Sequence, residues 1–185
     1  MIGRMLRACR LDSSVFELVE NDPSYSAEAR RVVLVVAVIA ATGAGLHSLS
    51  IGVEAALVAF LGRGLFVWFG WVAWAAISEW LGTTLTAGEE THSDMGEAFR
   101  VLAYAQTPWI LGAFVFLPRV GWALFLLAGL WVLAAGTVAI RQALDFSTSR
   151  AVLTVIIGWV VMLAVFIVLT LLAMIVRAAL GGMIS

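Results

Sequence analysis

The sequence is poor in charge, in cysteine and in motifs that bind phosphate. Only 12% of its 185 residues are charged, whereas a soluble domain averages about 25%. All 11 basic residues are Arg, and a net charge of -1 leaves no basic face for the phosphates of a nucleic acid. Cys9 is the single cysteine, so an internal disulfide is excluded. These absences argue against a nucleic-acid-binding protein and against a disulfide-stabilised domain.

Catalytic and cofactor motifs are also missing. There is no phosphate-binding loop or nucleophile elbow, and neither Gly43-Ala44-Gly45 nor Gly62-Arg63-Gly64 extends into a dinucleotide fingerprint. His47 and His92 fall on opposite sides of the membrane in the topology given below, which argues against a histidine metal site within one chain. We therefore predict no enzyme activity, no catalytic or metal-binding residues and no cofactor.

Apolar residues, by contrast, are in excess. They make up 63% of the chain, against roughly 45–50% in a soluble domain, and a soluble core cannot absorb that surplus. A membrane-spanning helix needs about 20 apolar residues. Five runs come close to that length: Val32–Leu49, Leu65–Leu85, Val101–Leu117, Gly121–Ile140 and Ala151–Val176. The sequence thus predicts an all-α fold, a polytopic membrane bundle of five transmembrane helices.

A short amphipathic segment precedes the first run. Apolar residues recur there at helical spacing, with three arginines off their stripe: Ile2, Met5, Leu6 and Cys9 against Arg4, Arg7 and Arg10. This pattern is typical of a helix in the membrane interface, although periodicity alone leaves open that the helix packs on the protein's own loops. Asp22 followed by Pro23 predicts the N-terminus of the next helix. We divide the chain into a cytoplasmic segment, residues 1–31, a five-span bundle, 32–176, and an external tail, 177–185.

The arginines predict the orientation of the chain. With the N-terminus inside, eight of the 11 arginines fall on the cytoplasmic side, and three on the outside: Arg63, Arg119 and Arg177. The glycines of Gly62-Arg63-Gly64 predict a break before the second span, with Arg63 at the outer headgroups. The expected location is the cell inner (plasma) membrane, with multiple passes, a cytoplasmic N-terminus and an external C-terminus.

Glu79 is an acid within the second span. A carboxylate in the bilayer is costly and is usually paired or functional. We expect a structural ion pair with Arg100, Arg141 or Arg150, and a proton or ion relay is the alternative. The tryptophans of the same span, Trp68, Trp71, Trp74 and Trp80, indicate packing and interface anchoring rather than a ligand cage.

Two further features surround the third span. The loop that precedes it carries Glu89, Glu90, Asp94 and Glu97, which we interpret as a docking loop. Its carboxylates could also hold a hard cation, but their spacing matches no calcium loop and favours a solvated turn. Within the span, Pro108 predicts a bend, and the freed carbonyl of Tyr104 is expected to bind Gln106, Thr107 or a neighbouring helix.

The order of several segments resembles a known family. The segments are Arg10-Leu11-Asp12-Ser13-Ser14-Val15-Phe16, the aromatic stretch Trp68 to Trp74, Phe99-Arg100-Val101-Leu102-Ala103-Tyr104-Ala105-Gln106-Thr107-Pro108, and Arg141-Gln142-Ala143-Leu144-Asp145-Phe146-Ser147 followed by Arg150-Ala151. Together they resemble the Yip domain proteins, five-span membrane proteins that interact with Ypt/Rab GTPases, and within them the shorter prokaryotic branch. Ala103 stands where family members often have Gly.

The resemblance implies an integral membrane adaptor or organiser without enzyme activity. The sequence lacks the long cytosolic domain of the eukaryotic members, so their GTPase link is not carried over. We expect action by protein or lipid interaction at the cytoplasmic face, with the lipid bilayer, a protein partner or a second copy of the chain as partners, and no nucleic acid. The alternative is a small transporter or channel component that uses Glu79 and the broken third span at Pro108.

Overall fold

The protein is an all-helical bundle in the part of the chain that the computed structural model describes, residues 1–84 and 95–184. For residues 166, 169, 170 and 173–184 only the backbone is described. The elements are α1 (Ile2–Cys9), α2 (Ser13–Asn21), η1 (Pro23–Tyr25), α3 (Ser26–Ser48), α4 (Val53–Thr84), α5 (Met95–Ala105), η2 (Thr107–Phe114), α6 (Gly121–Ala143) and α7 (Thr148–Ile184).

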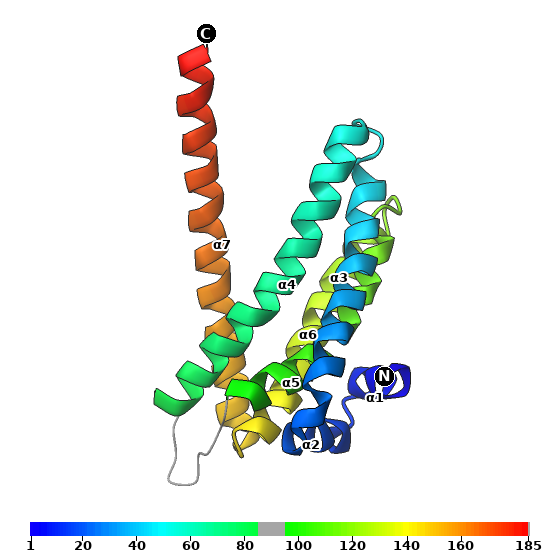
Figure 1. Ribbon diagram of the computed structural model, residues 1–185, viewed down its shortest axis with the longest axis vertical. Coiled ribbons are helices and arrows are strands. Elements are labelled where there is room, and N and C mark those ends of the chain that lie inside the picture. The colour runs from blue at the N-terminus through cyan, green and yellow to red at the C-terminus, as the bar shows by residue number, and fades with distance from the viewer. Residues whose placement is uncertain (85–94, 185) are drawn as a thin grey trace.

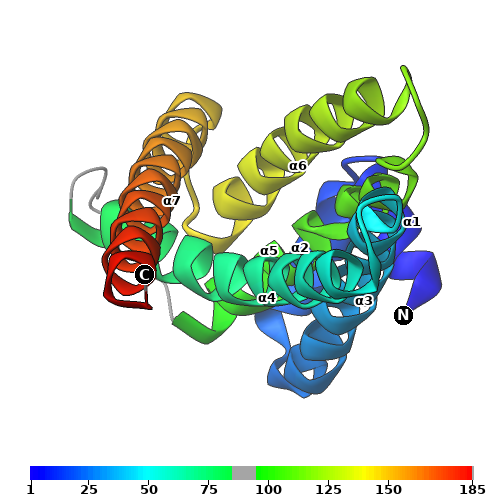
Figure 2. The same ribbon diagram turned by 90° about the horizontal axis from the view of Figure 1, so that it is seen from above.

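The long helices run between two ends of the molecule (Figure 1). We call the end that holds α1, α2 and the α6–α7 turn the basal end, and the opposite one, with the α3–α4 turn, the distal end. The N-terminus lies at the basal end, whereas α7 carries the C-terminus to the distal end. Seen from above, α4 runs across the molecule between α7 and α3 (Figure 2).

Four helices of the described chain are long and apolar enough to cross a membrane, judged by length and composition: Pro23–Ser48, Val53–Thr84, Gly121–Ala143 and Thr148–Val165. Each corresponds to one of the predicted spans, and the protein is a multi-pass membrane protein. Asp22 accepts a hydrogen bond from the Ser24 amide, with Pro23 next to it, so the predicted helix start is confirmed.

Helix α4 differs from the sequence prediction. The expected break at residues 62–64 is wrong, because α4 is continuous from Val53 to Thr84. A glycine in a helix costs up to about 1 kcal/mol. Opening the backbone in lipid costs more, since no water replaces the lost hydrogen bonds. The helix therefore runs through Gly62 and Gly64, and Arg63 lies within it rather than at its end.

The third predicted span is split in two. The α-helix α5 ends at Ala105, and the chain continues as the 3-10 helix η2 from Thr107. Pro108 explains the change, because it has no amide hydrogen and its ring clashes with the carbonyl four residues earlier. η2 packs closely on α3, since a Cβ at Gly43 would collide with the carbonyl oxygens of Gly112 and Ala113. Glycine at position 43 thus permits the approach of two backbones.

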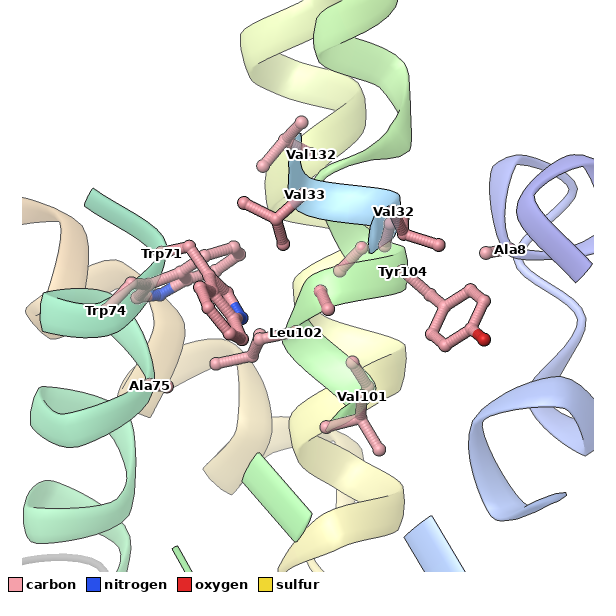
Figure 3. Packing of buried hydrophobic residues seen from close by; sticks show 14 of the residues in the cluster. Ala8, Val32, Val33, Trp71, Trp74, Ala75, Val101, Leu102, Tyr104 and Val132 are labelled. Carbon is pink, nitrogen blue, oxygen red and sulfur yellow. The ribbon is translucent and has the colours of Figure 1, made fainter. Parts of the chain in front are cut away.

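Helix α5 is the centre of the bundle. All of its residues from Val101 to Ala105 are fully buried, as is Ala98, and Arg100 is 5% exposed. Trp71 and Trp74 of α4 face Leu102 on one side of this core, and Tyr104 points to the opposite side, toward α1 (Figure 3). The second half of α5, Val101 to Ala105, carries no charged side chain, as expected for a helical segment that neighbours surround. The packing role expected for these tryptophans is confirmed by their burial.

Candidate functional site at the basal end

A cluster of polar side chains ties α1 to the bundle at the basal end. Glu28 of α3 lies at its centre and accepts hydrogen bonds from Arg4 of α1, with Nε to Oε1 at 2.9 Å, and from the Tyr104 hydroxyl at 2.6 Å. The N-terminal ammonium lies 3.4 Å from the same carboxylate. The Arg4 guanidinium also stacks 4.8 Å from the ring centroid of Tyr25. The cluster therefore joins α1, α3 and α5 through one carboxylate.

Two more side chains bind the ends of the N-terminal helices. Arg100 of α5 donates from Nε to the Val19 carbonyl at 2.7 Å, and from Nη2 to the carbonyl of Glu20. Trp131 of α6 donates from Nε1 to the Cys9 carbonyl at 2.7 Å. The last carbonyls of a helix have no partner within it and carry its negative partial charge. Arg100 and Trp131 satisfy these carbonyls and so fasten α2 and α1.

The docked helix α1 keeps one apolar side exposed. Met5 and Ala8 are buried against the bundle, whereas Ile2 and Leu6 are 68% and 55% exposed. The apolar stripe of α1 therefore has two environments. One part packs on the protein, and the other remains available to lipid.

Carboxylates from three segments gather beside α2. Glu20 of α2 interacts electrostatically with Glu97 of α5, with Asp145 of the α6–α7 turn and with Glu17. Partial burial and, after it, repulsion from these three acids raise the pKa of Glu20 from 4.5 to about 7, although Arg100 opposes the shift. We call Glu17, Glu20, Glu97 and Asp145 the acidic face. Sequence order alone could not reveal it, because Glu97 and Asp145 are far from Glu17 and Glu20 in the chain.

The predicted docking loop is only partly described. Glu97 lies in the first turn of α5 and belongs to the acidic face. Glu89, Glu90 and Asp94 lie outside the described residues, so their docking role stays a prediction. Within the described ranges, no three His, Cys, Asp or Glu side chains are arranged to hold a metal ion.

The three arginines that were expected near Glu79 make different contacts. Arg100 directs its guanidinium to the carbonyls of α2, as described above. Arg141 donates to the Gln142 side-chain oxygen at 3.2 Å, and Arg150 is exposed in the first turn of α7. Glu79 itself is half-buried near the basal end of α4. The ion pair of Glu79 with an arginine stays a prediction.

The residues of the predicted bend lie together where α5 meets η2. The Thr107 hydroxyl donates to the Tyr104 carbonyl at 2.7 Å, so one of the expected side chains satisfies the carbonyl that Pro108 leaves free. Gln106, Thr107 and Pro108 are all buried. Tyr104 thereby has two roles, because its carbonyl belongs to the bend and its hydroxyl to the Glu28 cluster.

Arg63 lies within α4, whereas the sequence predicted it at the end of a span. Its guanidinium carbon lies 4.8 Å from the ring centroid of Trp109, 5.2 Å from Phe125 and 5.7 Å from Phe66. Nη2 is buried without a hydrogen-bond partner among the described residues. Aromatic faces attract a cation and so replace part of its lost hydration. The sequence does contain Trp109, directly after Pro108, as a candidate partner for a cation. No sequence pattern, however, shows that Trp109 faces Arg63 of α4.

The comparison with known families decides the assignment. The chain matches the Yip1 domain over residues 13–169. The chain belongs to the Yip1 family. The match begins at α2, so it includes α2 and Arg100, which binds it, and it ends within α7. Yip1 proteins are membrane proteins and are not known as enzymes. Searches of curated proteins and of solved structures gave no match.

Proposed function

We propose that the chain crosses the inner (plasma) membrane five times, with the basal end in the cytoplasm. Besides the four continuous helices, α5 with its 11 residues and η2 with its 8 each span about 16 Å. Together they match the roughly 30 Å of a hydrocarbon core. The termini at opposite ends of the bundle (Figure 1) and the excess of arginine at the basal end support this topology.

Cysteine labelling tests the topology. In a background with Cys9 replaced by Ser, single cysteines at Ser24 and Ser147 should react with an impermeant maleimide only from the cytoplasm. Cysteines at Ser50 and at the C-terminal residue, Ser185, should react only from outside. Labelling of residue 185 from the cytoplasm would contradict the fifth crossing.

In this membrane, we propose, the protein is an adaptor or organiser whose acidic face binds a basic segment of a partner protein. The observation that carries the proposal is the packing of α2, with Glu17 and Glu20, against α5 and α6, which brings Glu97 and Asp145 to the same face. Like charges held together cost energy in the free protein, and a cationic partner would relieve that cost. The bonds of Arg100 and Trp131 hold α2 and α1 in place beside this face.

Site-specific crosslinking tests the docking role. A photoreactive residue placed at Glu17 should give a discrete crosslinked protein in native membranes, and the same residue at Glu54, on the distal part of α4, should not. Glu97→Lys with Asp145→Lys should abolish the crosslink. Asp145 is exposed and contributes little to folding, so Asp145→Lys alone should leave the melting temperature within a few degrees. A crosslink that survives both reversals would contradict the proposal.

The alternative, a transporter or channel component, rests on polar atoms between α4 and α7. Trp74 Nε1 and Ser78 Oγ are buried without a hydrogen-bond partner among the described residues, and both lie near Gly158. Glu79 follows Ser78 directly. Selective ion or solute flux in liposomes that contain the pure protein, abolished by Glu79→Gln, would favour this function over the adaptor. A structural ion pair at Glu79 instead predicts that Leu lowers the melting temperature more than Gln, since Leu leaves the arginine unpaired.

A further inference from the structure

A cleft opens at the basal end between α3, α4 and α5. It has a volume of about 290 Å³, and its lining includes Ser26 and Arg30 of α3, Trp71 and Val72 of α4, and Phe99 and Arg100 of α5. This volume lies at the lower limit of small-molecule pockets, which measure about 300–1,000 Å³. The cleft is therefore large enough for a headgroup or the first part of an acyl chain, but not for a large soluble ligand.

Polar and apolar parts of the lining come from different helices. Ser26 and Arg30, one turn apart on α3, supply a hydroxyl and a guanidinium. Arg30 is exposed, and no hydrogen bond or ion pair with the rest of the described chain engages it. Val72, Trp71 and Phe99 supply the apolar wall. One side of the cleft thus suits an anion, and the other suits hydrocarbon.

The apolar wall is rigid. Trp71 donates from Nε1 to the Phe99 carbonyl at 3.0 Å, and its ring packs edge-on against Phe99 with centroids 5.2 Å apart. The ring of Trp68 packs edge-on against Trp71 as well, with centroids 5.5 Å apart. The indole hydrogen is already used, so the wall offers an occupant only apolar contact. A preformed wall lowers the entropic cost of binding.

The position of the cleft identifies a lipid as its occupant. Arg30 precedes Val32, where the apolar run begins, by about 3 Å along the helix axis, which is headgroup depth. Arginine binds phosphate oxygens in a fork. Arg100 also lines the cleft, but its guanidinium donates to the carbonyls of Val19 and Glu20. Glu20 and Asp22 offset part of its charge, so Arg30 is the main attraction for an anion.

From this geometry we propose that the cleft binds an anionic phospholipid of the basal leaflet. Arg30 and Ser26 hold its phosphate, and one acyl chain lies against Trp71, Val72 and Phe99. The cleft adjoins the acidic face, because Gly96 and Arg100 line it beside Glu97 and Glu20, but its occupant does not depend on the identity of a protein partner.

Native mass spectrometry of the full chain in neutral detergent tests the proposal. Dioleoyl-phosphatidylglycerol should bind more tightly than dioleoyl-phosphatidylcholine. Arg30→Gln should weaken the first bound phosphatidylglycerol about tenfold, as expected when one charge-assisted hydrogen bond is lost. Arg31→Gln is the matched control, because Arg31 is an exposed neighbour that does not line the cleft, and it should change the affinity less than about twofold.

A second variant tests the apolar wall. Val72→Phe fills the space for the acyl chain and leaves Arg30 intact, so it should also weaken phosphatidylglycerol binding, with an unchanged melting temperature in lipid-free detergent. Competition by inorganic phosphate alone would overturn the lipid assignment in favour of a free anion. Equal binding of the two lipids, or equal effects of Arg30→Gln and Arg31→Gln, would overturn the site.

Discussion

Tyr104 donates a 2.6 Å hydrogen bond from the centre of the bundle to Glu28, the carboxylate that also binds Arg4. The ring of Tyr104 is fully buried, whereas the side chain of Glu28 is 20% exposed. A single phenol therefore connects the most buried helix with the N-terminal segment. The hydroxyl of Tyr104 forms this hydrogen bond, whereas its ring packs in the core. A substitution can therefore remove the hydrogen bond and keep the packing.

Tyr104→Phe removes the hydroxyl and keeps the ring. We expect it to lower the free energy of unfolding by about 1–2 kcal/mol, because a hydrogen bond to a charged group is lost. Protease cleavage within α1 should become faster. The matched control is Tyr25→Phe, which keeps the ring under Arg4 and should have little effect. Thermal unfolding in detergent and limited proteolysis measure both effects, and equal results for the two variants would contradict the role of Tyr104.

The indole of Trp74 lies directly against Gly136 of α6, where a Cβ would collide with the ring. We expect Gly136→Ala to destabilise the protein by about 1–3 kcal/mol, since a buried ring has to move. Gly129→Ala on the same helix is the control, because its nearest neighbour is Trp109 at 3.6 Å, an ordinary contact. Gly129→Ala should be neutral or slightly stabilising, as Ala is the better helix former. Melting curves of the two variants that coincide would disprove this contact.

Arg63 is held by aromatic rings rather than by an anion in the described chain. Arg63→Lys should destabilise the protein by about 1–2 kcal/mol, because an ammonium is more strongly hydrated and stacks less well on a ring. Arg63→Met should be neutral or stabilising, since it removes a buried charge and keeps the packing. The same two substitutions at the exposed Arg31 should have no effect on the melting temperature. A stabilised Lys variant would contradict the cation–π interpretation.

Glu20 should make stability depend on pH. Its pKa is about 7 in the folded protein and 4.5 ordinarily, so the folded state binds the proton more tightly than the unfolded state. Unfolding between these values releases a proton, and stability should fall as the pH rises from about 4.5 to about 7. Glu20→Gln should reduce that fall, and Glu54→Gln at the distal end should not. Melting temperatures across this range measure the effect, and parallel curves for wild type and Glu20→Gln would contradict it.

The parts of the fold that depend on local chemistry could be predicted from the sequence. Asp22 with Pro23 starts a helix, and Pro108 ends one, because each effect involves backbone groups within four residues. Local chemistry alone wrongly predicted a break at Gly62, since the surrounding lipid favours an intact helix there. Arg100 was one of three candidate partners for Glu79. Its bond to the Val19 carbonyl of α2, 81 residues earlier in the chain, could not be predicted, because no local pattern encodes that neighbour.

These long separations also determine when the N-terminal segment can reach its final place. The bond from Arg100 to Val19 spans 81 residues, and the bond from Trp131 to Cys9 spans 122. A ribosome adds residues in order, so α1 and α2 emerge well before the side chains that hold them. The bond to α2 cannot form before α5 is made, nor the bond to α1 before α6, and until then the exposed Ile2 and Leu6 can lie in lipid. The helices α1 and α2 are therefore held by these bonds only after later parts of the bundle have been made.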